Sequence, residues 1–153
     1  MLVKQLLSMK QDTAKPWIDA GTIVTITPDV TLAEAAQLLA EKRIGAVVVS
    51  TDGRSPVGIL SERDIVRQLG RNGIEVLSQT VSEVMTTSVQ TCVPGEDAMT
   101  ILERMTEGRF RHMPVVDEDG AMLGVVSIGD AVSGRLKELA AEKEALTGMI
   151  MGN

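Results

Sequence analysis

The sequence contains almost no aromatic residues: Trp17 and Phe110 are the only two among 153 residues. Any core built from this chain must therefore be aliphatic. Cys92 is the only cysteine, which excludes an intrachain disulfide and a multi-cysteine metal site. Basic side chains are also scarce, with 15 Lys and Arg against 21 Asp and Glu. The resulting net charge of −6 argues against a protein that coats nucleic acid.

Long hydrophobic runs are missing as well. The apolar stretches, such as 46–49, are far shorter than a membrane span, and Lys4 and Gln5 interrupt the apolar residues near the N-terminus. We therefore expect a cytoplasmic protein that binds neither membrane nor nucleic acid. A small anionic ligand is still compatible with the acidic composition, because a pocket responds to its nearest charges.

An internal repeat organises the chain. A shift of 66 positions superimposes residues that punctuate secondary structure. The matching pairs are Pro28 and Pro94, Gly58 and Gly124, Ser61 and Ser127, and Asp64 and Asp130. An earlier segment, 3–7, resembles 81–85 at a shift of 78, which indicates 12 extra residues in the first repeat. We expect these residues, at about 11–22, to form an exposed loop because the segment is polar and contains Pro16 and Gly21. The predicted repeats span 1–78 and 79–153.

Each repeat shows the order strand, helix, strand, strand, helix. In the first repeat we predict strands at 23–26, 46–49 and 57–60, with a turn at Asp52-Gly53. The first helix should begin with a capping box between Thr31 and Glu34 and run to about Arg43. The second should begin at Ser61 and stop at Gly70; the second repeat copies the pattern from Val89. The predicted fold class is α+β, with helix-covered sheets and the two repeats packed face to face, since one unit is too small to bury its own core.

One motif carries the predicted chemistry. Gly-x-x-Ser-x-x-Asp occurs at 58–64 and again at 124–130. In both copies a strand ends and a helix begins at the Ser, where backbone N–H groups and a partial positive charge suit phosphate. The Asp returns to the same rim and can accept hydrogen bonds from both hydroxyls of a ribose, while the Gly allows close approach. The alternative is that Ser-x-x-Asp is only a helix-capping box that needs no ligand.

These motifs, the Asp-Gly turns at 52–53 and 119–120, and the segment 111–116 resemble CBS domains, and the pair resembles a Bateman module. The resemblance covers about 3–139 and implies a stand-alone pair of repeats related by pseudo-two-fold symmetry. It further implies that an adenosine-containing ligand (AMP, ADP, ATP, NAD(H) or S-adenosylmethionine) lies in clefts between the repeats. Carried over, the ribose-binding role falls on Asp64 and Asp130, and Ser61 and Ser127 lie near phosphate.

Other residues are candidates by their chemistry. The guanidinium groups of Arg63 and Arg111 suit phosphate, although a solvated rim or ion pairs with acids would also explain them, and Arg109 is a weaker candidate. His112, the only histidine, either lines the cleft or forms a local hydrogen bond. Adenine must lodge among apolar side chains. The full predicted binding set is Ile26, Val47, Val48, Gly58, Ser61, Arg63, Asp64, Cys92, Arg111, His112, Met113, Pro114, Gly124, Ser127 and Asp130.

The two clefts are not expected to be equivalent, because 45–48 in the first repeat corresponds to 111–114 in the second and Gly129 replaces Arg63. A long helix from Ile128 should carry an apolar stripe past the domain. Its members are Val132, Leu136, Leu139, Leu146 and Ile150. Because CBS pairs commonly associate as flat homodimers, we expect a homodimer; the alternative is that this helix folds back on its own domain.

The sequence therefore predicts a regulatory module that senses energy or redox state through an adenine nucleotide and signals to an effector protein by a change in conformation or assembly. Catalysis is not expected. The dinucleotide fingerprint is missing, Asp130 stands where a P-loop needs Lys, and one His and one Cys cannot build a metal site. We expect no catalytic cofactor. The alternatives are a ligand-free dimeric scaffold and an S-adenosylmethionine binder.

Overall fold

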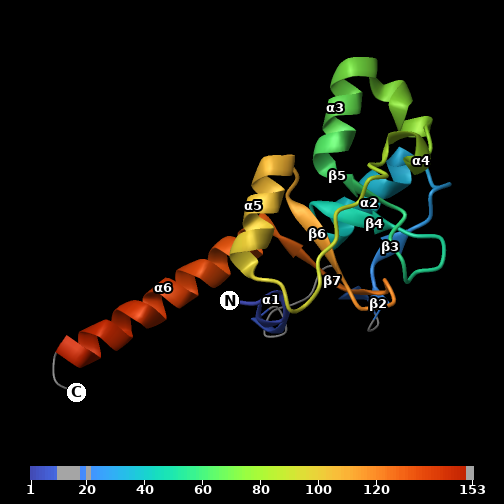
Figure 1. Cartoon of the computed structure of the whole chain (residues 1–153). Helices are drawn as coiled ribbons and strands as arrows, with labels where there is room; N and C mark the ends of the chain where they lie inside the picture. Colours follow the sequence, from blue (N-terminus) through green and yellow to red (C-terminus); the bar gives the residue numbers. More distant parts are fainter. Residues whose placement is uncertain (10–17, 20–21, 151–153) are drawn as a thin grey trace.

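The chain folds into two similar halves, each with a small sheet covered by helices (Figure 1). The computed structural model describes residues 1–9, 18–19 and 22–150. In the first half the elements are α1 (Val3–Met9), β1 (Ile18–Asp19), β2 (Thr22–Ile23), β3 (Thr25–Ile26), α2 (Leu32–Lys42), β4 (Ala46–Val49), β5 (Gly58–Ser61), α3 (Glu62–Asn72) and the 3-10 helix η2 (Ile74–Ser78). In the second half they are α4 (Val81–Val84), α5 (Ala98–Gly108), β6 (His112–Val116), β7 (Met122–Ser127) and α6 (Ile128–Ile150).

The α+β class and the predicted element order are confirmed, with differences of detail. The strand predicted at 23–26 is divided into β2 and β3, and its counterpart in the second repeat is reduced to a single parallel bridge between Cys92 and Val115. The helix expected to stop at Gly70 continues to Asn72, where Gly73 ends it with a φ of 80°. Of the loop predicted at about 11–22, residues 11–17 and 20–21, Trp17 among them, lie outside the described residues, while residues 18–19 and 22 belong to the short strands β1 and β2.

Local sequence explains the helix ends. Thr31 caps α2 by accepting a hydrogen bond from the Glu34 backbone N–H at 3.2 Å, as predicted. Asp97 caps α5 in the second repeat by accepting from Met99 N at 3.0 Å. Both helices end on an arginine in the left-handed conformation, Arg43 with φ 55° and Arg109 with φ 58°. The two arginines match at the shift of 66, so the repeat extends to backbone conformation.

Strand β4 and most of β6 are continuously apolar and buried, as expected where both faces of a sheet are covered, whereas Leu123 of β7 is 45% exposed. In β4, Val47 and Val49 point into a core with α2 and α3, whereas Val48 points the other way and contacts Val116 and Met122 of the second repeat. The two sheets therefore pack face to face, as predicted. Sheet order is β3-β4-β5 in the first repeat, with β3 parallel and β5 antiparallel to β4, and β6 pairs antiparallel with β7 in the second.

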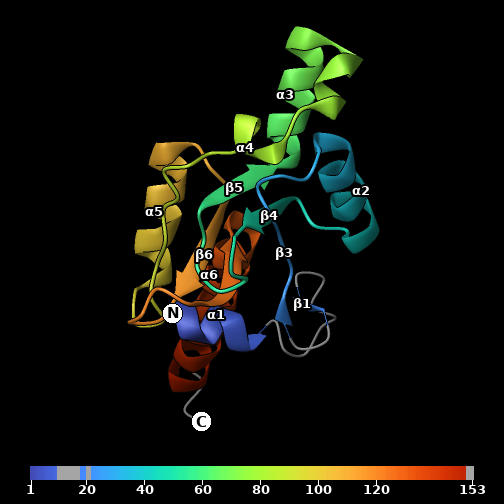
Figure 2. The same cartoon turned by 90° about the vertical axis from the view of Figure 1, so that its right-hand side faces the viewer.

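The first helix of each half packs against the other half (Figure 2). Val3 and Leu6 of α1 belong to the core of the second repeat, and Val81 of α4 belongs to the core of the first. Backbone hydrogen bonds repeat this exchange. Val3 N donates to Glu96 O at 2.9 Å, and Val81 N donates to Val30 O at 2.8 Å. The pseudo-two-fold arrangement is thus built by reciprocal exchange of two short helices.

Helix α6 projects away from both repeats (Figure 1). Its first turns bury Ala131 and Gly134 against the domain, while its apolar stripe stays exposed along its length. The predicted long helix is confirmed, and the alternative that it folds back on its own domain is wrong. Within the described ranges, no helix has the length and apolar character that crossing a membrane requires.

Candidate functional site

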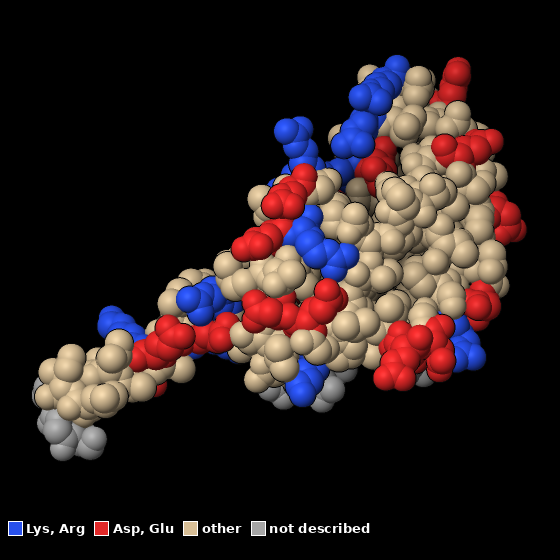
Figure 3. Space-filling model, in the orientation of Figure 1, with Lys and Arg blue, Asp and Glu red and all other residues tan. Residues whose placement is uncertain are grey.

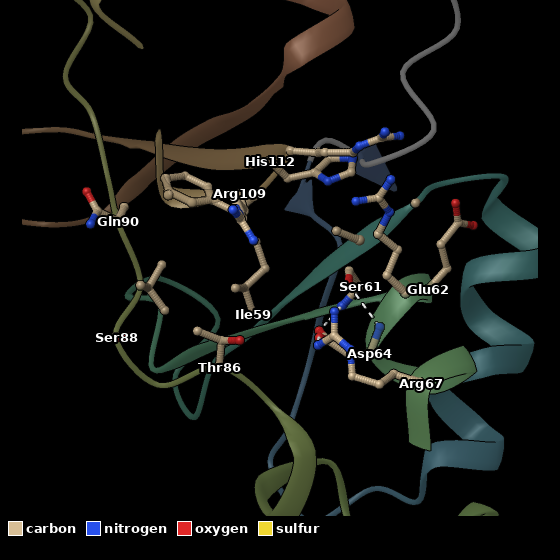
Figure 4. A pocket seen from close by; sticks show the side chains of 17 residues that line it. Ile59, Ser61, Glu62, Asp64, Arg67, Thr86, Ser88, Gln90, Arg109 and His112 are labelled. Atoms are coloured by element: carbon tan, nitrogen blue, oxygen red, sulfur yellow. Dashed lines mark hydrogen bonds and ion pairs between the residues drawn. The ribbon is translucent and has the colours of Figure 1, made fainter. Parts of the chain in front are cut away.

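A cleft of about 470 Å³ lies between the two repeats (Figure 4). Such a volume is within the usual range for small-ligand sites. The first repeat contributes the start of β4, the end of β5 and the first turns of α3; the second contributes its entry segment 86–90 and the loop 108–112. The complete lining is Gly45, Ala46, Ile59, Ser61, Glu62, Arg63, Asp64, Arg67, Thr86, Ser88, Val89, Gln90, Gly108, Arg109, Phe110, Arg111 and His112.

The Ser61–Asp64 junction sits at one side of this cleft and forms a closed capping box. Ser61 N donates to Asp64 Oδ2 at 2.9 Å, and Asp64 N donates to Ser61 Oγ at 3.2 Å. The pair Ser127 and Asp130 repeats this geometry, with 2.7 Å and 3.1 Å for the corresponding bonds. The capping interpretation is therefore geometrically correct at both junctions. It does not preclude ligand binding, because a carboxylate offers about four lone-pair sites and the cap holds it in one orientation.

The amides at the start of α3 are largely engaged within the protein. Besides the two capping bonds, Glu62 N donates to Gly45 O at 2.9 Å. Three of the four N–H groups that a helix start leaves without an intrahelical acceptor are thus satisfied. The phosphate-binding role expected of these amides is reduced, and charged side chains around the cleft become the main candidates for holding an anion.

Those side chains are unusually basic for so acidic a protein. Four of the nine arginines line the cleft, against two acids, Glu62 and Asp64. Arg67 Nη1 lies 3.7 Å from Asp64 Oδ1, while Arg109 and His112 occupy the opposite side of the cleft in Figure 4. In the space-filling view the Lys and Arg side chains gather largely near the upper ends of α3 and α5, and acidic side chains are spread over the rest of this face (Figure 3).

Five residues of the predicted binding set meet in this cleft: Ser61, Arg63, Asp64, Arg111 and His112. The cleft thus joins the acid of the first repeat to the basic loop of the second. Asp130, Ser127 and Gly124 lie outside it, at the symmetry-related junction. The corresponding entry segment there contains residues 20–21, which are not among the described residues.

The predicted apolar residues do not line this cleft. Ile26 and Val47 are in the first core, Cys92 and Met113 are in the second, and Val48 is in the contact between the sheets. Pro114 is buried in β6. Gly58 is also outside the cleft. A Cβ atom there would lie 2.4 Å from Met85 Sδ, so this glycine makes room for the side chain of Met85.

Sequence reasoning missed the apolar lining of the cleft, Ile59, Val89 and Phe110, and the whole entry segment. The segment is brought in by pairing between Ile59 and Thr86, whose backbone N–H and C=O groups exchange two bonds of 3.0 Å. Phe110 packs against Gly108, where a Cβ atom would lie 2.4 Å from its ring. The sequence did offer a signal for Phe110, because it is one of only two aromatic residues in the chain and lies between two arginines.

Cys92 has the environment of a structural residue. Its side chain is 2% exposed, and burial, followed by the charge of Glu96, raises the pKa of its thiol to about 12. Among all the residues that the structure describes, no group of three or more His, Cys, Asp or Glu side chains is placed to hold a metal ion.

Fold and cleft together define a tandem α+β module whose two repeats share a cleft. The CBS domain family matches the chain at residues 20–71 and 81–136, and the chain belongs to that family. The structure is similar to the CBS-domain containing protein ATU1752 from Agrobacterium tumefaciens, with 38% identity, a TM-score of 0.76, and coverage of 88% of this chain and 99% of that one. A CBS-domain protein from Burkholderia ambifaria is similar at 35% identity and a TM-score of 0.77, covering 90% and 95% of the two chains.

Curated relatives extend beyond the matched region. The chain is 32% identical to the mitochondrial CBS domain-containing protein CBSX3 of Arabidopsis thaliana over 136 residues, 86% of this chain and 66% of that protein. It is 33% identical to a 17.7 kDa protein of Acidianus ambivalens over 71% of this chain and 64% of that one. The chain therefore spans just under two thirds of the length of these relatives.

Proposed function

We propose that this chain is a cytoplasmic regulatory module that binds an adenine nucleotide (AMP, ADP, ATP or NAD(H)) in the cleft between its repeats. The observation that carries the proposal is the meeting of Asp64 and Ser61 of one repeat with Arg111 and His112 of the other. A ligand there contacts both repeats at once, so binding changes their relative stability or position and is passed to an effector protein or to the assembly state.

Ligands of related structures support an adenosine-containing molecule. The CBS domain protein PAE2072 from Pyrobaculum aerophilum was solved complexed with AMP, and the CBS pair of MJ0100 with 5′-methylthioadenosine and S-adenosyl-L-methionine. Their identities to this chain are 24% and 26%. A regulatory rather than catalytic role agrees with the junction itself, because the Ser61 hydroxyl oxygen serves as a helix cap.

A thermal-shift panel of AMP, ADP, ATP and NADH tests the proposal. At about 100 times its dissociation constant, a ligand adds about 2.7 kcal/mol of stability, which raises the Tm of a chain this size by about 5–10 °C. Asp64→Ala should abolish the increase at this cleft. Asp97→Ala is the matched control, because it also removes an aspartate helix cap but from outside the cleft. Absence of any shift in the wild type, or an undiminished shift in Asp64→Ala, would overturn the proposal.

The closed capping boxes favour one rival, a ligand-free interaction module in which both Ser-Asp pairs serve only the helices. If this rival is correct, no nucleotide in the panel raises the Tm of the wild type. The only effect of Asp64→Ala and Asp130→Ala is then a lower stability of the ligand-free protein. The same measurements therefore decide between the two functions.

We also propose that the module forms a homodimer through α6. Val132, Leu136, Leu139, Leu146 and Ile150 are all exposed, and Lys143 completes a spacing that alternates between four and three residues. This is the spacing of a helix that pairs with a second helix, and a polar residue at one such position sets register. The distal end of α6 is also free of charge (Figure 3), which suits contact with a second copy.

Light scattering after size exclusion tests the dimer. The wild type should elute as a dimer, and the double variant Leu139→Glu/Leu146→Glu as a monomer with an unchanged circular dichroism spectrum. Lys137→Glu, on the same helix but off the stripe, should remain dimeric. A monomeric wild type at tens of micromolar would show that the stripe has another use.

A further inference from the structure

We infer that the cleft around Asp64 selects nucleotides with a diphosphate or triphosphate chain over nucleoside monophosphates and over cationic adenosyl compounds. This inference rests on the proposed function and narrows its ligand. It begins from the four arginines of the lining, Arg63, Arg67, Arg109 and Arg111, which come from two elements on different repeats.

The first pair lies one helical turn apart on α3. Arg63 and Arg67 both line the cleft, and Arg67 approaches Asp64 at 3.7 Å with its side chain 55% exposed. An exposed ion pair of this length is weak, so the Arg67 guanidinium can turn to a stronger anion at little cost. Asp64, with its side chain only 19% exposed, stays in place through the capping box.

The second pair belongs to the loop between α5 and β6. Arg109 and Arg111 flank Phe110, and all three line the cleft. The left-handed backbone at Arg109 turns the chain sharply after α5, with its N–H bonded to the last carbonyls of that helix. Both sides of the cleft therefore carry guanidinium groups, which bind phosphate oxygens through paired, planar N–H donors.

The backbone amides at the start of α3 contribute little to phosphate binding. Three of the four orphan amides at the start of α3 are bonded within the protein, so phosphate binding depends mainly on the arginines. A single phosphate satisfies few of four guanidinium groups. A longer chain carries more negative charge and more acceptor oxygens, whereas a sulfonium compound adds a positive charge to a site that is already basic.

Three of the four arginines have no arginine at the corresponding position of the other repeat. At the shift of 66, Arg63 corresponds to Gly129 and Arg67 to Ser133, while Arg111 corresponds to Gly45. The two junctions share their Ser-Asp caps, and Arg109 has a counterpart in Arg43, but the other three arginines are not repeated. The cap is therefore common to both repeats, and the preference for a long phosphate chain belongs to the cleft that contains Asp64.

Isothermal titration of the full chain with ATP, ADP, AMP and S-adenosylmethionine, without magnesium and at two salt concentrations, tests the inference. We expect ATP and ADP to bind at least about tenfold more tightly than AMP, and S-adenosylmethionine to bind most weakly. Arg63→Ala and Arg111→Ala should each lower the ratio of ATP to AMP affinity by about tenfold. Arg71→Ala, on the same helix but outside the cleft, should leave that ratio unchanged.

The outcomes separate the inference from the function on which it rests. Binding of AMP or S-adenosylmethionine as tightly as ATP, or an equal loss for all ligands in the arginine variants, overturns the phosphate-chain preference and leaves the nucleotide-binding function standing. Failure of all four ligands, and of NADH in the thermal-shift panel, to bind the wild type overturns both. Circular dichroism of each variant confirms that a lost preference does not arise from unfolding.

Discussion

Two glycine-to-alanine substitutions in helices should change stability in opposite directions. The added methyl group would collide with a core side chain at one position and meet open space at the other. Gly134 is buried in α6, and a Cβ atom there would lie 2.4 Å from Leu6 Cδ2 of α1. Gly70 is inside α3, and a Cβ atom there would have no neighbour within 4 Å. The comparison tests directly whether α1 packs on the second repeat.

The magnitudes follow from two competing terms. Alanine in a helix interior gains about 1 kcal/mol over glycine, and at Gly70 this gain stands alone. At Gly134 the same gain is opposed by overpacking of about 1–3 kcal/mol, since Leu6 is 1% exposed and its methyl group has little room to move. We expect Gly70→Ala to raise the Tm by about 2–4 °C and Gly134→Ala to lower it by a similar amount.

Calorimetry and urea unfolding measure both variants. A third variant, Leu6→Ala, should cost about 2–5 kcal/mol alone, and less in the Gly134→Ala background because the clash is relieved. If Gly134→Ala proves as stable as Gly70→Ala, or if the Leu6 and Gly134 substitutions are strictly additive, then α1 does not pack against α6 as the structure shows.

Three further outcomes are expected. Asp64→Ala and Asp130→Ala should each lose about 1 kcal/mol of stability without ligand, in chemical denaturation, and a difference of several-fold between them would contradict the matched caps. Cys92, buried and with its thiol pKa raised to about 12, should react with a thiol reagent only after unfolding; rapid labelling of the native protein would refute this. The Ser55 and Arg54 amides and the Ser50 hydroxyl donate to Asp52 and lower its carboxyl pKa to about 2. The charged carboxylate therefore contributes to stability at any pH above the usual pKa of an aspartate, and this contribution is lost as the pH falls through about 2. A carboxyl titration near 4 by NMR would count against it.

Part of the candidate site follows from sequence alone. Ser61, Asp64 and Arg63 are neighbours along the chain, and a helix start brings them together whatever the rest of the protein does. The role of the apolar candidates did not follow in the same way. Val47 and Val48 are adjacent in β4, yet they point to opposite faces and enter two different contacts, neither of which is the cleft. An apolar strand buried on both faces does not reveal which face meets a ligand.

What the sequence by itself determined is the local structure: the two repeats, the order of their elements and their helix caps. These features depend on residues within a few positions of one another, and the same local signals occur in both repeats, 66 positions apart. Only the tertiary structure shows that α1 packs on the core of the second repeat and α4 on the core of the first. It also shows that the loop 108–112 and Asp64 line the same cleft. Two repeats with the same local signals can combine in more than one way, and the choice is made by packing between residues far apart in the chain.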